Sequence, residues 1–77
     1  MAENINKLAW RCRRGTKELD VLMQKYLNEY YQAASEDLQH AFQRMLDMQD
    51  PELYNLLVGR QVSEDQNINK VIEYIYR

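Results

Sequence analysis

Apolar residues recur along the chain at the three- and four-residue spacing of amphipathic α-helices. The clearest stripe begins just after position 17 and consists of Leu19, Leu22, Met23, Tyr26, Leu27 and Tyr30. With four shorter stripes, it predicts helices over about residues 4–14, 17–31, 36–48, 51–58 and 64–76. We therefore expect an all-α fold in which residues 1–77 form one compact single-domain bundle of about five short helices.

Residues that favour helix ends lie in the gaps between these segments. Ser35 is placed to cap the third helix, and Gly59 is placed to end the fourth. Asp50 followed by Pro51 has the form of an N-cap and the first helical residue. Residues 63–66 read Ser-Glu-Asp-Gln and have the form of a capping box that opens the last helix.

Gly15 lies between the first two predicted helices and can adopt the left-handed conformation that ends a helix. The next helix can then start with Thr16 as its N-cap or with Gly15 itself in that position. In the second register Glu18 could reach back to the free amides of the first turn. In either register Glu18 and Asp20 lie near the helix start, where the dipole favours negative charge.

The first helix carries a tryptophan that core packing does not explain. Its expected apolar stripe consists of Ile5, Leu8, Ala9 and Cys12, whereas the opposite side carries Lys7, Trp10, Arg11 and Arg14. These sides follow from about 100° of rotation per residue. Tryptophan and arginine are enriched among the residues that dominate protein–protein binding energy. We therefore expect part of the Trp10 ring to be exposed as a contact residue.

Charge is distributed unevenly along the chain. Residues 1–17 carry five basic groups against one acid, and residues 18–77 carry five basic groups against eleven acids, which gives the net charge of −2. A basic end on an acidic body suits an oriented protein contact more than general nucleic-acid binding. One cysteine excludes an internal disulfide and fits a reducing compartment, and no membrane span or signal peptide is visible. These features favour a cytoplasmic protein.

The sequence offers no constellation for stand-alone catalysis, so we expect a protein that is not an enzyme. A structural zinc site needs four Cys or His ligands, whereas this chain has one of each, Cys12 and His40. We interpret Cys12 as a core residue and His40 as a surface or boundary residue. No glycine-rich loop follows a predicted strand, so no dinucleotide fingerprint exists. We expect no metal ligands, no catalytic residues and no cofactor-binding residues.

Two motifs resemble a known family. Arg14-Gly15-x-x-Glu18, with Trp10-Arg11-Cys12-Arg13 before it and Leu19-Asp20 after it, is similar to the signature of the succinate dehydrogenase assembly factors, the flavinators. The stretch Asp50-Pro51-Glu52-Leu53-Tyr54-Asn55 resembles the second recurring stretch of that family, and the likeness extends from about Asn4 to Tyr76. Lys7 and Ala9 stand where the family pattern has arginine and histidine. Lys7 keeps the charge but lacks the planar fork of arginine.

The resemblance implies a function. Members of the family bind the flavoprotein subunit of succinate dehydrogenase, in some cases that of fumarate reductase, and promote covalent attachment of FAD. FAD then belongs to the partner, whose own histidine performs the chemistry, and is not bound tightly by this chain. The resemblance implies a partner-binding site formed by Arg14, Gly15 and Glu18, surrounded by Trp10, Arg11, Arg13 and Asp20. A sharper alternative gives Glu18 a direct role in proton transfer.

Two other classes of function stay open at this point. A small helical regulator or antitoxin-like protein could bind another protein or nucleic acid through the basic face of the first helix. A purely structural bundle would use Gly15 and Glu18 for stability alone. Phosphate contacts would make binding to nucleic acid strongly salt-dependent, which distinguishes the first of these alternatives.

Overall fold

The computed structural model describes residues 5–13 and 15–76, with the backbone alone described at Ile5. All regular structure in these residues is helical. The elements are α1 (Ile5–Arg11), α2 (Lys17–Tyr26), the π-helical turn η1 (Leu27–Tyr31), α3 (Glu36–Leu46), α4 (Asp50–Leu57) and α5 (Gln66–Ile75). The expected all-α bundle of about five short helices is confirmed.

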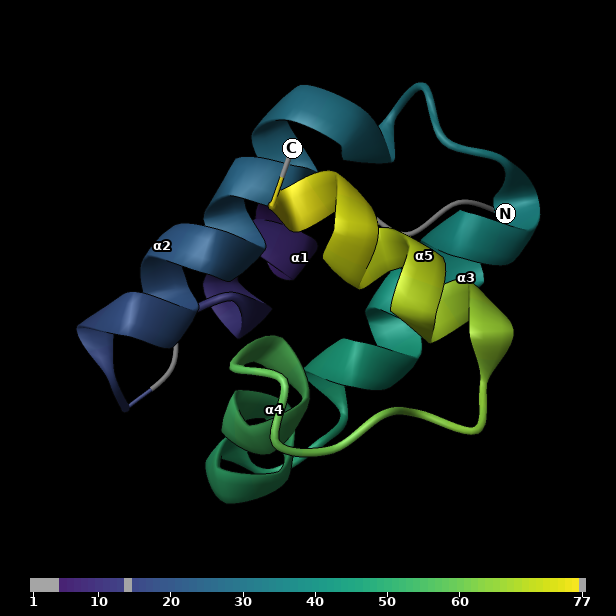
Figure 1. Ribbon diagram of the computed structural model, residues 1–77. Coiled ribbons are helices and arrows are strands. Elements are labelled where there is room, and N and C mark those ends of the chain that lie inside the picture. The colour runs from purple at the N-terminus through teal and green to yellow at the C-terminus, as the bar shows by residue number, and fades with distance from the viewer. Residues whose placement is uncertain (1–4, 14, 77) are drawn as a thin grey trace.

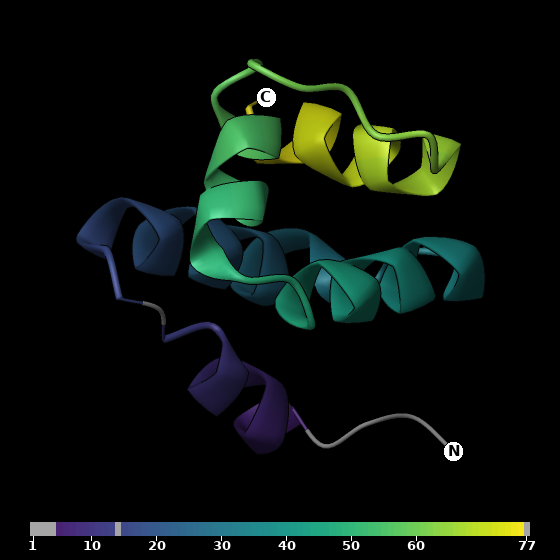
Figure 2. The same ribbon diagram turned by 90° about the horizontal axis from the view of Figure 1, so that it is seen from below.

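The helices are stacked in three levels (Figures 1 and 2). α2 with η1 and α3 form the middle level, α5 lies across one side of it, and α1 lies on the other side. α5 packs mainly on α3 and also on α2. The short α4 connects the middle level to the level of α5 (Figure 2). The radius of gyration is 11.2 Å, close to the value of about 11.5 Å expected for a compact chain of this length.

Every helix contributes apolar side chains to one core. The buried residues are Leu8, Cys12, Leu19, Met23, Tyr26, Leu27, Tyr31, Ala41, Phe42, Met45, Leu46, Leu53, Leu56, Leu57, Ile68, Val71 and Ile75. Cys12 is fully buried, which confirms its interpretation as a core residue, and His40 is exposed as expected. Burying such side chains contributes about 1.5–3 kcal/mol for each large aliphatic or aromatic group.

The end of the second predicted helix differs from the sequence pattern. Residues 27–31 form a π-helical turn, in which each amide bonds to the carbonyl five residues before it. This wider turn places Tyr31 below Tyr26, so Tyr31 is buried and Tyr30 is half-buried. The Tyr31 hydroxyl accepts a 2.8 Å hydrogen bond from Gln43 of α3. A pattern that assumes 3.6 residues per turn selected Tyr30 because it does not anticipate the extra residue.

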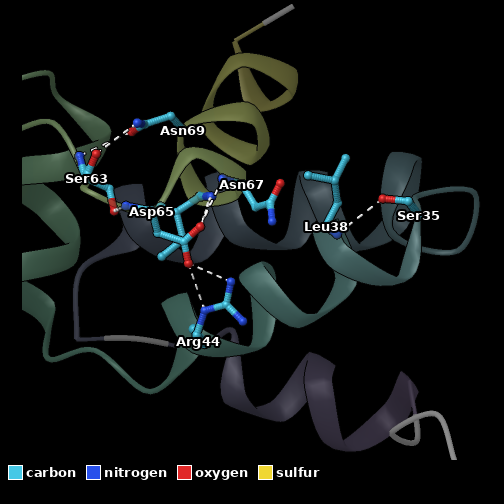
Figure 3. Close-up of polar contacts among 8 residues, drawn as sticks. Ser35, Leu38, Arg44, Ser63, Asp65, Asn67 and Asn69 are labelled. Atoms are coloured by element: carbon cyan, nitrogen blue, oxygen red, sulfur yellow. Dashed lines mark hydrogen bonds and ion pairs between the residues drawn. The ribbon is translucent and has the colours of Figure 1, made fainter.

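Three helix ends follow the local sequence. Thr16 caps α2, with its hydroxyl accepting a 3.3 Å hydrogen bond from the Leu19 amide, so Thr16 rather than Gly15 is the N-cap. Ser35 caps α3 in the same way through the Leu38 amide (Figure 3). Gly59 follows α4 with φ of +83°, the left-handed conformation that glycine adopts without a Cβ clash.

The start of α5 corrects a prediction. Asp65, and not Ser63, is the N-cap, because its carboxylate accepts hydrogen bonds from the Asn67 and Ile68 amides. Arg44 of α3 donates two hydrogen bonds to the same carboxylate, at 3.0 and 2.6 Å (Figure 3). The Ser63 hydroxyl instead accepts from the Asp65 amide. Hydrogen bonds from Arg44 and from the two amides hold the pKa of Asp65 below its usual value.

Candidate protein-interaction surface

The segment that links α1 to α2 forms an exposed corner. Arg13, Gly15 and Thr16 are exposed there, and Thr16 begins the next helix. Arg14, the first residue of the Arg-Gly-x-x-Glu motif, lies outside the described residues. The φ angle of Gly15 is defined partly by Arg14, so the expected left-handed conformation of Gly15 lies outside the description as well.

Asp50 holds this corner from the start of α4. Its Oδ2 atom accepts a 2.9 Å hydrogen bond from the amide of Gly15, although the two residues lie 35 positions apart. The predicted N-cap role of Asp50 was therefore wrong. Gln49 is the N-cap and makes no side-chain capping bond, while Asp50 is the first residue of the helix. The Asp50 carboxylate serves the neighbouring segment instead, so the two motifs of the sequence meet in space.

Glycine leaves room for this contact. A Cβ atom at position 15 would lie 3.0 Å from Oδ2 of Asp50, which is closer than ordinary van der Waals contact. A side chain at position 15 would require this carboxylate to shift by a few tenths of an ångström. Glycine therefore keeps the corner both tied to α4 and exposed.

Arg11 forms an internal ion pair. Its guanidinium bonds to the carboxylate of Asp47, the C-cap residue of α3, and its side chain is half-buried. Since Arg11 lies at the end of α1, the pair ties α1 to α3 on the side of the corner that faces the bundle. Arg11, one of the predicted contact residues, therefore holds α1 in place. Part of its guanidinium is already occupied by Asp47.

Trp10 lies at the open side of α1. It is 70% exposed, which confirms the expectation from the helical pattern. The Arg13 guanidinium lies 5.0 Å from the centre of the indole ring, within the range of a cation–π contact. Trp10 and Arg13 line a shallow hollow with Asn6, Ala9 and Gln24, so this hollow is shared by α1 and α2. The aromatic ring of Trp10 and the basic group of Arg13, both in the predicted site, therefore lie at this hollow.

Glu18 and Asp20 face different sides of α2. Residues two positions apart on a helix are rotated by about 200° from each other, so the two carboxylates point to nearly opposite sides. Glu18 is exposed and lines a second hollow with Lys17, Val21, Leu22 and Tyr76. Burial raises the pKa of the Tyr76 hydroxyl, and the nearby Glu18 carboxylate raises it further. Asp20 is half-buried and its amide bonds to the Thr16 carbonyl at 3.2 Å.

Sequence reasoning missed three residues of this region. Asp50 was assigned a local cap, and Asp47 had no assigned partner. Val21 is 56% exposed although it is apolar, and it interrupts the polar face of residues 17–31 in the way that Trp10 interrupts the polar face of α1. That interruption was a visible signal in the sequence. The Asp50 and Asp47 contacts had no such signal, because their partners are more than thirty positions away.

Neither a membrane span nor a metal centre is found in the described part of the chain. No helix there has the length and apolar character needed to cross a bilayer. Within residues 5–13 and 15–76, no three histidine, cysteine or acidic side chains are grouped so that they could hold a metal ion.

Known proteins resemble this chain along almost its whole length. The family described as "Flavinator of succinate dehydrogenase" matches residues 6–77. The FAD assembly factor SdhE of Colwellia psychrerythraea is 40% identical over 74 residues, covering 96% of this chain and 81% of that protein. The proteins of the same name from Coxiella burnetii and Xylella fastidiosa are 35% and 41% identical, over 90% and 88% of this chain and 84% and 70% of their own lengths. The chain therefore belongs to the flavinator of succinate dehydrogenase family.

Proposed function

We propose that this protein is an assembly chaperone for the flavoprotein subunit of succinate dehydrogenase. It binds that subunit and promotes covalent attachment of FAD, and the fumarate reductase flavoprotein is a second candidate partner. Family membership and the names of its relatives support this proposal. The lone thiol of Cys12 fits a reducing compartment, so we place this function in the cytoplasm.

One observation about this chain carries the proposal further, namely the bond between Gly15 and Asp50. It holds the corner in place while Gly15 stays exposed, so a partner backbone can approach closely. Trp10 and Arg13 lie on one side of α2 and Glu18 lies on another. A patch that carries both signs of charge around an open backbone favours one orientation of the partner.

The chaperone needs no catalytic group of its own in this proposal. It would act by binding more tightly to the conformation of the flavoprotein in which its histidine and the flavin are close. Such differential binding shifts the population of the partner toward that conformation. A preference of about 100-fold would correspond to about 2.7 kcal/mol. FAD stays with the partner throughout, and we expect no tight cofactor binding by this chain and no nucleic-acid binding.

The direct test uses cells that lack the protein. Covalent flavin on the succinate dehydrogenase flavoprotein is measured by in-gel fluorescence after restoring wild type, Gly15→Arg or Glu18→Ala. Val62→Ala serves as a matched control, because Val62 is 80% exposed and lines neither hollow. We expect wild type and Val62→Ala to restore fluorescence, whereas the two corner variants do not. Unchanged fluorescence in cells without the protein would refute the proposal.

A further inference from the structure

Two of the exposed large apolar side chains in the described residues meet in one hollow. Val21 of α2 and Tyr76, which follows α5, are each 56% exposed. They line a hollow of about 440 Å³ with Leu22, Lys17 and Glu18. Neither residue belongs to the partner-binding set that the sequence predicts. Their exposure leaves apolar surface uncovered in a shallow, open hollow.

The walls of this hollow are held in position. The Tyr76 hydroxyl donates a hydrogen bond of 2.5 Å to the carbonyl of Leu57 at the end of α4. Lys25 of α2 donates a 2.8 Å hydrogen bond to the carbonyl of Ile75, at the end of α5. Lys25 therefore ties α2 to α5 beside Tyr76 and satisfies a terminal carbonyl of the helix. A hollow whose walls are already ordered costs less conformational entropy when a partner fills it.

The hollow is continuous with the corner. Glu18 belongs both to the Arg-Gly-x-x-Glu motif and to the wall of the hollow. Val21 lies on α2 between Glu18 and Gln24, and Gln24 lines the hollow of Trp10, so α2 contributes residues to both hollows. A partner that contacts Glu18 therefore reaches the wall that Val21 and Tyr76 share with it.

We infer that this hollow binds an apolar side chain of the flavoprotein subunit, beside an arginine or lysine of that subunit that pairs with Glu18. The inference rests on the proposed function and names the chemistry that its partner must present. An exposed apolar centre with charges at its rim is the usual arrangement of a protein-binding surface. Lys17 at the same rim would repel a second basic group, which restricts the partner to one orientation.

The test measures the affinity of the full chain for purified flavoprotein subunit by isothermal titration calorimetry. Val21→Glu places a second acid near Glu18 and removes apolar surface from the hollow, so we expect Kd to rise roughly tenfold or more. Val62→Glu is the matched control, because it makes the same change at an exposed valine outside the hollow. We expect its Kd to equal that of wild type. Thermal unfolding of both variants checks that they are folded.

A second variant gives a readout that does not depend on an added charge. Tyr76→Ala removes the ring from the hollow, whereas Tyr76→Phe keeps the ring and loses only the bond to Leu57. We expect the alanine variant to weaken binding roughly tenfold and the phenylalanine variant to weaken it less.

The outcomes separate the inference from the proposed function. If Val21→Glu and Tyr76→Ala bind like wild type while Glu18→Ala loses binding, the hollow is not part of the interface and the inference is overturned. If wild type does not bind the flavoprotein at all, the proposed function and the inference are both overturned. Sedimentation velocity tests whether a second copy of this chain fills the hollow. If Val21→Glu converts a dimer to a monomer and leaves flavoprotein binding intact, a second copy fills the hollow and the inference is again overturned.

Discussion

The amide of Gly15 donates a 2.9 Å hydrogen bond to Oδ2 of Asp50, and this bond joins the α1–α2 corner to the first residue of α4. Each residue belongs to a different motif of the sequence. The bond explains why an aspartate is found at position 50 although it does not cap its own helix. It also makes the shape of the corner depend on a distant segment.

Removing the Asp50 carboxylate tests this dependence. Asp50→Ala should lower the free energy of unfolding by about 0.5–1.5 kcal/mol, the usual net contribution of one hydrogen bond. Flavinylation in complemented cells should fall more than this loss of stability explains, because the corner loses its support. Asp50→Asn is the control, since its amide oxygen can still accept from Gly15. Equal flavinylation by the alanine variant and wild type would show that the corner is set by other contacts.

Gly15→Ala should act through Asp50. The added Cβ would lie 3.0 Å from Oδ2, so the carboxylate that accepts from the residue 15 amide must shift by a few tenths of an ångström. We expect a loss of about 1 kcal/mol in wild type and a smaller loss in the Asp50→Ala background, because neighbouring residues are not additive. Urea unfolding of the four proteins measures this coupling. Additive losses would mean that the two residues act independently.

Variants of Arg11 and Asp47 test whether Arg11 acts by placing α1 or by contacting the partner directly. Their ion pair lies partly in solvent, with side-chain exposures of 34% and 71%, so Arg11→Ala should cost at most about 1 kcal/mol. Increasing salt should reduce the difference from wild type. Asp47→Ala should weaken flavoprotein binding about as much as Arg11→Ala if Arg11 acts by placing α1. A loss of binding confined to Arg11→Ala would instead identify Arg11 as a direct contact.

The Arg44–Asp65 pair should make stability depend on pH in acid. The pKa of Asp65 is lower in the folded protein than in the unfolded chain, chiefly because Arg44 bonds to its carboxylate. Its contribution is therefore fully present above the unfolded pKa of about 3.9 and is lost as pH falls through the lower, folded value. Asp65→Asn keeps a good N-cap but lacks the charge. Unfolding curves of wild type and Asp65→Asn should converge as pH falls from about 6 to about 2. A constant difference would assign the effect to capping.

Tyr26 should make stability depend on pH in alkali rather than in acid. Among the described residues its buried hydroxyl has no hydrogen-bond partner. Burial raises its pKa to about 12, and the nearby Tyr74 and Tyr31 add to the shift. Tyr26→Phe should be as stable as wild type at neutral pH, or more stable by up to about 1 kcal/mol. Wild type should lose more stability than Tyr26→Phe as pH rises from about 10 through 12, because Tyr26 ionises first in the unfolded chain. Thermal unfolding at pH 7 and in alkali checks both statements.

The sequence by itself determined the features that depend on near neighbours. The spacing of apolar residues selects helices and places Cys12 inside and Trp10 outside, since one turn of helix fixes which side chains share a face. Thr16 and Ser35 cap their helices through amides three residues away, and Gly59 adopts the left-handed conformation that its missing side chain permits. These interactions close within a few residues, so a local pattern is enough to predict them.

The tertiary structure decided which distant groups meet. Asp65, which also pairs with Arg44 of α3, takes the cap expected of Ser63. The π-helical turn buries Tyr31 and leaves Tyr30 half-buried against the core. Val21 and Tyr76 share a hollow only because α2 and α5 pack together. Asp50 leaves its own helix uncapped and bonds to Gly15, since the packing of α4 brings its carboxylate to that amide. A sequence pattern carries the residue types of such contacts, but the folded arrangement of the helices selects the partners.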